Sequence, residues 1–311
     1  MARKDRGPGH LPTLALLGDV DPGAPRAAGW QIAGRLPTTP YDDPRDAPAY
    51  VDLDELLADT RVDAVAVDGA DPRAAEALPA LRRAGLLLLL VGAAPLNLGP
   101  VRELRAMPGA EVAVGLLQRW EPWAVTVAAA LPLAGGAPLQ VTVRGWPRGP
   151  TAAAELVDLA SSWCGDVAAV AAAPEALPVR TLPGGARVAW SLLTAGGATV
   201  LVSNDDAPPL VRLSFATARL EAGPLGARWV GGAELTLPSP TDRRERPLPV
   251  PPGVPAGLVA AAHALLGAVG GVELPTGAWP WAADLGDLLV AARVLEALRT
   301  SAATGALVRT G

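Results

Sequence analysis

The sequence predicts an α/β domain with a parallel sheet, followed by an α+β domain with an open, mainly antiparallel sheet. Short apolar runs alternate with helical patterns over the first third of the chain. Short strands separated by Gly, Asn, Asp and Pro turns then follow, and helical patterns close the chain. The 311 residues, half of them hydrophobic, are enough for two cores.

The first domain is expected over 11–118. Leu86 to Val91 is apolar at every position, which is typical of a parallel strand covered on both faces. Asp71-Pro72 and Gly85 have the residue types that begin and end a helix. Strands are expected at 14–18, 62–67, 86–91 and 111–115, and helices at 52–59, 71–84 and 100–107. This order indicates a truncated Rossmann-like domain, with a Pro/Gly/Asp-rich stretch reaching to about Ala49.

The second domain is expected over 119–305, with helices on one face of its sheet. Strands are expected at 139–143, 187–193, 199–203, 210–215, 217–222 and 234–237, and helices at 121–131, 153–163, 258–269 and 281–302. A charged, Pro-rich loop is expected at 242–253. The last helix is a candidate to pack back on the first domain. Because an open sheet has to cover its free face, association with a second copy or with a relative is expected.

Composition excludes several classes of function. The formal net charge is −5 and no basic block stands out, so nucleic acid is an unexpected partner. No apolar run approaches the roughly 20 residues that span a bilayer, and no secretory signal is visible. The single cysteine, Cys164, suits a reducing compartment. A cytoplasmic protein without a metal site is therefore expected.

Several segments resemble the Gfo/Idh/MocA family of nicotinamide-dependent sugar oxidoreductases. The resemblance covers roughly residues 11–305, and its motifs belong to the scaffold of the fold. The matching segments are Tyr50 to Asp59 followed by Val62 to Val65, Ala75 to Gly85, Leu156 to Leu159 with Trp163 and Gly165 to Val167, and Leu288 to Gly305. The resemblance implies a cofactor domain followed by a substrate domain, and a cleft that holds NAD(P) and a small molecule.

The family's glycine fingerprint, G-x-G-x-x-G, lets the backbone approach a pyrophosphate. Leu14 to Pro22 looks most like the family's second strand, whose terminal acid, here Asp19, would bind the adenosine ribose. On this interpretation the first strand and the phosphate-binding turn are absent. The rival interpretation makes Leu14 to Gly18 the first strand and Gly18 to Gly23 a decayed fingerprint. In both, Asp19 and Asp21 also suit a turn and helix cap.

The family's Glu-Lys-Pro motif follows the strand that ends near Val91. Pro95 fits the proline of that motif, so Ala94 stands where the lysine belongs and Ala93 where the glutamate belongs. The only lysine in the chain is Lys4. An arginine-rich composition would replace lysine by arginine, whereas the residue here is alanine.

The family's D-x-G-x-H-x-x-D motif supplies its usual general acid and base, a histidine. With Asp158 as the last aspartate, Glu155 stands at the histidine and Thr151 at the first aspartate. Glu155 is either a base with a raised pKa in an apolar cleft or a solvated carboxylate on the helix surface. His263, in an apolar helical pattern, is expected to be structural, and Cys164 to be a packing residue.

The segment from Arg119 to Trp123 lies at the predicted domain junction, where the family often has an arginine that lines the substrate cleft. Trp120 and Trp123 could stack on a ligand ring while Arg119 holds an anion. The alternative is that the two tryptophans pack the interface between the domains.

We interpret the chain as a pseudo-oxidoreductase that has lost cofactor and catalysis. It would associate through the open sheet with itself or with a related full-length oxidoreductase, or bind a small molecule in the old cleft. One alternative is a divergent NAD(P)-dependent oxidoreductase acting on a sugar or an imine, with Glu155 or Asp158 as the acid. Another is a non-redox biosynthetic enzyme, such as a lyase or isomerase.

Overall fold

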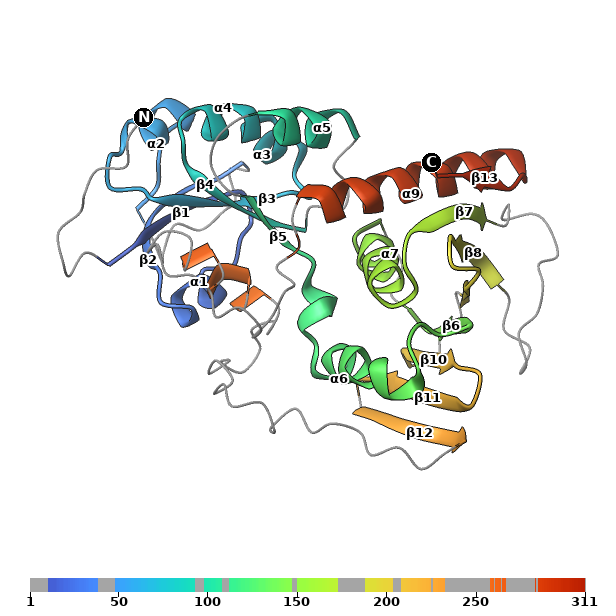
Figure 1. Ribbon diagram of the computed structural model, residues 1–311. Coiled ribbons are helices and arrows are strands. Elements are labelled where there is room, and N and C mark those ends of the chain that lie inside the picture. Colours follow the sequence, from blue (N-terminus) through green and yellow to red (C-terminus); the bar gives the residue numbers. More distant parts are fainter. Residues whose placement is uncertain are drawn as a thin grey trace. The chain divides into compact units, whose positions relative to one another are not determined.

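The chain forms two compact units (Figure 1). The first comprises Met1–Leu117 and Glu245–Leu289, and the second comprises Gln118–Arg244 and Val290–Gly311. The computed structural model describes residues 11–38, 48–92, 98–107, 112–146, 150–172, 188–203, 208–224, 226–232, 258–259, 261–263, 265–266, 283 and 285–310.

A five-stranded parallel sheet forms the centre of the first unit. Its order is β2-β1-β3-β4-β5, and a parallel bridge between Arg35 and Ala49 extends it beyond β2. The strands are β1 (Thr13–Leu17), β2 (Gln31–Leu36), β3 (Ala64–Asp68), β4 (Leu87–Val91) and β5 (Val112–Gly115).

Both faces of this sheet are covered, as the unbroken apolar strands predict. Leu14 and Leu16 of β1 face one apolar core, and Ala15 and Leu17 face the other. Figure 1 shows α2 to α5 over one face and α1 on the other. The helices are α1 (Gly23–Ala27), α2 (Leu53–Ala58), α3 (Pro72–Glu76), α4 (Leu78–Arg83) and α5 (Leu98–Ala106).

The strand order decides between the two interpretations of Leu14 to Pro22. With Ala49 counted as a rudimentary third strand, the sheet has the complete doubly wound order 3-2-1-4-5-6. The run at Leu14 is therefore the first strand, and the interpretation as a second strand is wrong. The truncation lies instead in the third strand and in α1, which has five residues.

Two local features of the first unit were not predicted. β2 and α1 lie in the Pro/Gly/Asp-rich stretch, where Gly34 breaks the strand pattern. A Cβ on Gly34 would lie 2.5 Å from the ring of Tyr50, which is too close for two carbon atoms. The position of this ring therefore requires glycine at residue 34. The helix expected over 71–84 is two helices with Ala77 between them. Pro79 explains the break, because it has no amide to donate to the carbonyl four residues earlier.

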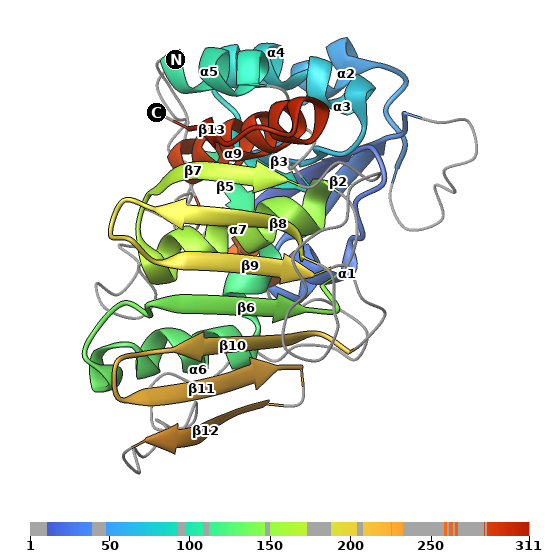
Figure 2. The ribbon, with the colours of Figure 1, turned by 90° about the vertical axis from the view of Figure 1, so that its right-hand side faces the viewer.

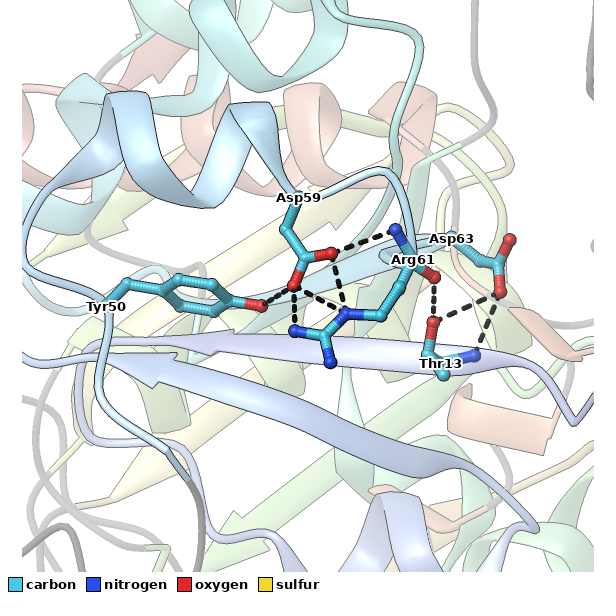
Figure 3. Close-up of polar contacts among 5 residues, drawn as sticks. All are labelled: Thr13, Tyr50, Asp59, Arg61 and Asp63. Carbon is cyan, nitrogen blue, oxygen red and sulfur yellow. Dashed lines mark hydrogen bonds and ion pairs between the residues drawn. The ribbon is translucent and has the colours of Figure 1, made fainter.

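A polar network joins the amino ends of β1 and β3 to the end of α2 (Figure 3). The hydroxyl of Tyr50 donates to Asp59 at 2.9 Å, and the guanidinium of Arg61 donates to both carboxylate oxygens. The hydrogen bonds from Arg61 hold the pKa of Asp59 well below its usual range. The amide of Thr13 donates to Asp63 at 2.9 Å. Ligands of open α/β sheets bind at the carboxyl ends of the strands, so we assign this network a structural role.

The second unit contains an eight-stranded sheet, shown face-on in Figure 2. Its order is β12-β11-β10-β6-β9-β8-β7-β13, and every pairing is antiparallel except β6 with β9. The strands are β6 (Gln140–Arg144), β7 (Val167–Ala172), β8 (Val188–Thr194), β9 (Thr199–Ser203), β10 (Leu210–Ser214), β11 (Ala218–Gly223), β12 (Gly226–Gly232) and β13 (Val308–Arg309).

Helices α6 (Pro122–Ala130) and α7 (Pro150–Cys164) lie on one face of this sheet (Figures 1 and 2). Two 3-10 turns, η2 (Leu117–Trp120) and η3 (Pro132–Ala134), flank α6. α9 (Leu285–Thr304) begins in the first unit and continues into the second. The mainly antiparallel open sheet with helices on one face confirms the predicted fold class.

β7, β12 and β13 were not predicted. The alanines of β7 and the glycines of β12 have little strand propensity of their own. These segments are strands because they pair with their neighbours in the sheet. The strand expected at 234–237 and the loop expected at 242–253 lie outside the described residues. In the segment expected as a helix over 258–269, the described residues 258–259, 261–263 and 265–266 are helical. α9 starts four residues later than expected.

Candidate functional site

The turn after β1 keeps two of the three fingerprint glycines. Gly18 and Gly23 have the spacing of the first and third glycines, and Val20 occupies the second position. Gly18 has φ +80°, and a Cβ there would lie 2.9 Å from the Cβ of Asp68. The second glycine is the one that lets a pyrophosphate approach the backbone, whereas the side chain of Val20 is buried in an apolar core. The surviving glycines are those with structural roles.

The amide donors of this turn are occupied by the protein itself. The amide of Gly18 donates to the carbonyl of Leu36 at 3.0 Å, and the amide of Gly23 donates to Oδ1 of Asp21 at 2.8 Å. The amide of Val20 donates to a carbonyl of the same turn at 3.1 Å. A phosphate binds such a turn by accepting these hydrogen bonds. Here one carboxylate and two backbone carbonyls accept them.

Negative charge gathers at the same edge of the sheet. Burial raises the pKa of Asp68, and the charges of Asp71 and Asp19 raise it further. Two nearby arginines donate to backbone carbonyls: Arg35 to Val20 at 2.6 Å and Arg73 to Thr38 at 3.0 Å. The two arginines keep their positive charge, so the misfit of a pyrophosphate rests on the carboxylates, on Val20 and on the occupied amides of the turn. The residues present do not fit the phosphates of a dinucleotide.

Asp19 lies after the first strand and not after the second. It is therefore not at the strand end that carries the ribose-binding acid in the doubly wound fold. β2 ends at Leu36, which is followed by Pro37 and Thr38. The described residues after β2 thus include no acid at that position. The bond from the amide of Gly23 to Asp21 supports the turn interpretation of this aspartate. The N-cap residue of α1 is Pro22, so Asp21 does not cap the helix.

The positions of the family's lysine and glutamate, Ala94 and Ala93, lie outside the described residues, as does Pro95. His263 is exposed, which contradicts its expected structural role. Burial raises the pKa of the Cys164 thiol to about 12, so its packing role is supported and a nucleophilic role is not.

Asp158 and Glu155 lie on the buried face of α7. The guanidinium of Arg119, which lies in η2, forms two hydrogen bonds to the two oxygens of Asp158, in a fork-to-fork pair. Both side chains are nearly inaccessible, at 9% and 3% exposure. Because the two side chains bind each other, this geometry does not suit Arg119 as the residue that holds an anion. It also does not suit Asp158 as an acid that exchanges protons with a substrate. Glu155 is 8% exposed, so its interpretation as a solvated surface carboxylate is wrong.

Trp123 packs inside the second unit. Its ring contacts Trp146 at 6.2 Å and Trp163 at 6.1 Å between centroids, both edge-to-face. It is 5% exposed, which favours packing over stacking on a ligand through its whole face. The backbone of Trp120 lies in η2, and its side chain is outside the described set.

A cavity of about 290 Å³ opens beside this cluster in the second unit. Its polar lining is Gln118 and Glu121, next to Trp123 and Trp146. Prolines and Val211 at the ends of β10 and β11 complete the wall. Sequence reasoning missed Glu121 and Trp146, since a lone Glu-Pro pair and a lone tryptophan carry no motif. The described residues contain no group of His, Cys, Asp and Glu side chains that could hold a metal ion.

Comparisons with known proteins support the fold. An oxidoreductase from Agrobacterium radiobacter, solved with NAD+, L-tartaric acid and magnesium, is 18% identical over 97% of this chain and 99% of its own, with a TM-score of 0.67. The WlbA dehydrogenase from Bordetella pertussis, solved with NADH and UDP-GlcNAcA, is 17% identical over 96% and 98%, with a TM-score of 0.68. The aldose-aldose oxidoreductase from Caulobacter crescentus, complexed with glycerol, is 17% identical over 96% and 99%, with a TM-score of 0.66.

No family model and no curated protein matches the sequence. The chain thus has the two-domain fold of Gfo/Idh/MocA-type oxidoreductases, as its sequence segments predict. Within the described part of the chain, every helix is too short or too polar to cross a lipid bilayer.

The Arg119–Asp158 pair provides a test of its structural role. Asp158→Asn leaves a buried guanidinium without its counter-charge, and we expect the free energy of unfolding to fall by about 3 kcal/mol. Urea unfolding at neutral pH measures this change. Because Arg119→Met with Asp158→Leu removes both charges, the double variant should recover most of the loss. A single variant as stable as the wild type would contradict the assignment.

Proposed function

We propose that this chain is a non-catalytic relative of nicotinamide-dependent oxidoreductases that does not bind a dinucleotide. The observation that carries the proposal is the turn from Gly18 to Gly23, whose amides of Gly18, Val20 and Gly23 donate to acceptors of the protein itself. Val20 in place of the second glycine supports the same conclusion, because it takes away the close approach that a pyrophosphate needs.

The buried pair Arg119–Asp158 is consistent with this proposal. If Asp158 were the acid of an active enzyme, it would have to release or accept a proton during the reaction. Here both of its oxygens accept hydrogen bonds from the guanidinium of Arg119, which does not suit that role. Asp158 therefore acts as an anchor between η2 and α7.

We further propose that the uncovered face of the eight-stranded sheet binds a related full-length oxidoreductase. The register places Arg144, Arg212, Arg219 and Arg228 on one face of the strands β6 and β10–β12, with Glu221 among them. Among the described residues of these four strands, the arginines on this face outnumber the glutamate, which pairs with Arg212 and Arg228. Figure 2 shows no described helix over this half. A partner whose sheet face carries carboxylates would complement it better than a second copy.

Binding of the cofactor tests the first proposal. Calorimetric titration of the chain with NADH and NADPH at neutral pH is expected to show no saturable binding up to about 1 mM, a range far above the affinities of working dehydrogenases. An active dehydrogenase of the same fold, titrated in parallel, is the control. Micromolar binding of either nucleotide would overturn the proposal.

The native mass of the protein, alone and mixed with a relative, tests the proposal that the sheet face binds a related oxidoreductase. Alone, the chain is expected to be monomeric at micromolar concentration and physiological salt. Mixed with a co-encoded relative, it is expected to form a hetero-oligomer that Arg212→Glu with Arg228→Glu weakens at least about tenfold. Glu296→Gln, an exposed change on α9, is the matched control. A stable homodimer of the wild type would contradict this assignment.

A further inference from the structure

The cavity beside Trp123 lies wholly within the second unit and has an unusual polar wall. Glu121, the N-cap residue of α6, lines this space together with Gln118, Trp123, Trp146 and apolar residues. Its volume of about 290 Å³ is at the lower end of the range for small-molecule sites. The site therefore suits a ligand of one ring or less.

The carboxylate of Glu121 forms no capping hydrogen bond and no ion pair among the described residues. Glu121 is the N-cap residue of α6, but its side chain makes no capping hydrogen bond. No described side chain forms an ion pair with it, and burial alone accounts for the raised pKa of its carboxyl group. A half-buried carboxylate without a counter-charge costs stability, which a cationic ligand would offset.

The aromatic walls of the cavity are held in fixed positions. The indole Nε1 of Trp146 donates to the carbonyl of Ala152 at 2.7 Å, which ties its ring to α7. Trp123 meets Trp146 at an interplanar angle of 76° and is backed by Trp163. Trp123 and Trp146 are 5% and 6% exposed, so a cation would meet only the part of each indole that lines the cavity. Indole is the best aromatic partner for a positive charge.

We propose that this cavity binds a small organic monocation, an alkylammonium group whose charge pairs with Glu121 and lies against Trp123 and Trp146. Gln118 supplies a further hydrogen-bond acceptor through its side-chain oxygen. An anion would be repelled by Glu121, and a neutral ring would leave the carboxylate without a partner. The inference goes beyond the proposed function, because it holds whether or not the first unit binds a dinucleotide.

Cyclohexylammonium and cyclohexanol are a matched pair of probes, since they share a ring and differ in charge. Titration of the full chain is followed by tryptophan fluorescence and by calorimetry at neutral pH. The ammonium is expected to bind at least about tenfold more tightly than the alcohol, as a desolvated cation–π contact and an ion pair would give. Equal affinity for the two probes, or no binding of either, would overturn the proposal.

Glu121→Gln keeps the size of the side chain and removes its charge. It is expected to abolish the preference for the ammonium while leaving weak binding of the alcohol. Glu296→Gln, an exposed carboxylate on α9, is expected to change neither affinity. A preference that survives Glu121→Gln would contradict the assignment. If this variant does not fold, the comparison of the two probes on the wild type still decides the outcome.

Discussion

The structure of the first unit depends on where the backbone amides after β1 find their acceptors. At the carboxyl edge of a parallel sheet, these amides are the groups that would hold an anionic ligand. In this chain the carboxylate of Asp21 and the backbone carbonyls of Gly18 and Leu36 accept three of them. The turn is thereby satisfied without a ligand, and the loop closes on the sheet as a structural corner.

The same principle applies to the second unit. A buried charge must be paired, and Arg119 pairs with Asp158. Trp123 is enclosed by two other tryptophans. Glu121 is the exception, because its carboxylate is desolvated and has no partner among the described side chains. The pair Arg119–Asp158 and the ring of Trp123 have partners within the protein. The carboxylate of Glu121 has none among the described side chains, which is why we propose a ligand for it.

The fold could be predicted from the sequence because several of its strands have clear hydrophobic patterns. Leu87 to Val91 is apolar throughout, and the alternation in β6 marks one wet face. β2 could not be predicted, since Gly34 is there to admit the ring of Tyr50, a contact 16 residues away in the chain. The order of the strands also required the structure. Both interpretations of the run at Leu14 satisfied the local pattern.

The candidate site was harder to predict than the fold. The sequence could show that Glu155 and Asp158 replace motif residues, but not that Glu155 is buried or that Arg119 holds Asp158. Spacing along a helix predicts which side chains share a face, whereas the pairing of a buried charge depends on a residue 39 positions away. Trp146 and Glu121 meet only because α6 and the end of β6 border the same cavity.

The amides of the turn itself offer the most direct test of the central claim. The chain, labelled with nitrogen-15 on glycine, is titrated with inorganic pyrophosphate, and the amide signals of Gly18 and Gly23 are followed by NMR. Because the amide of Gly23 already donates to Asp21 and the edge is acidic, neither signal is expected to move in a saturable way. A saturable shift of both signals at micromolar pyrophosphate would show that the turn still binds phosphate, and would contradict this account.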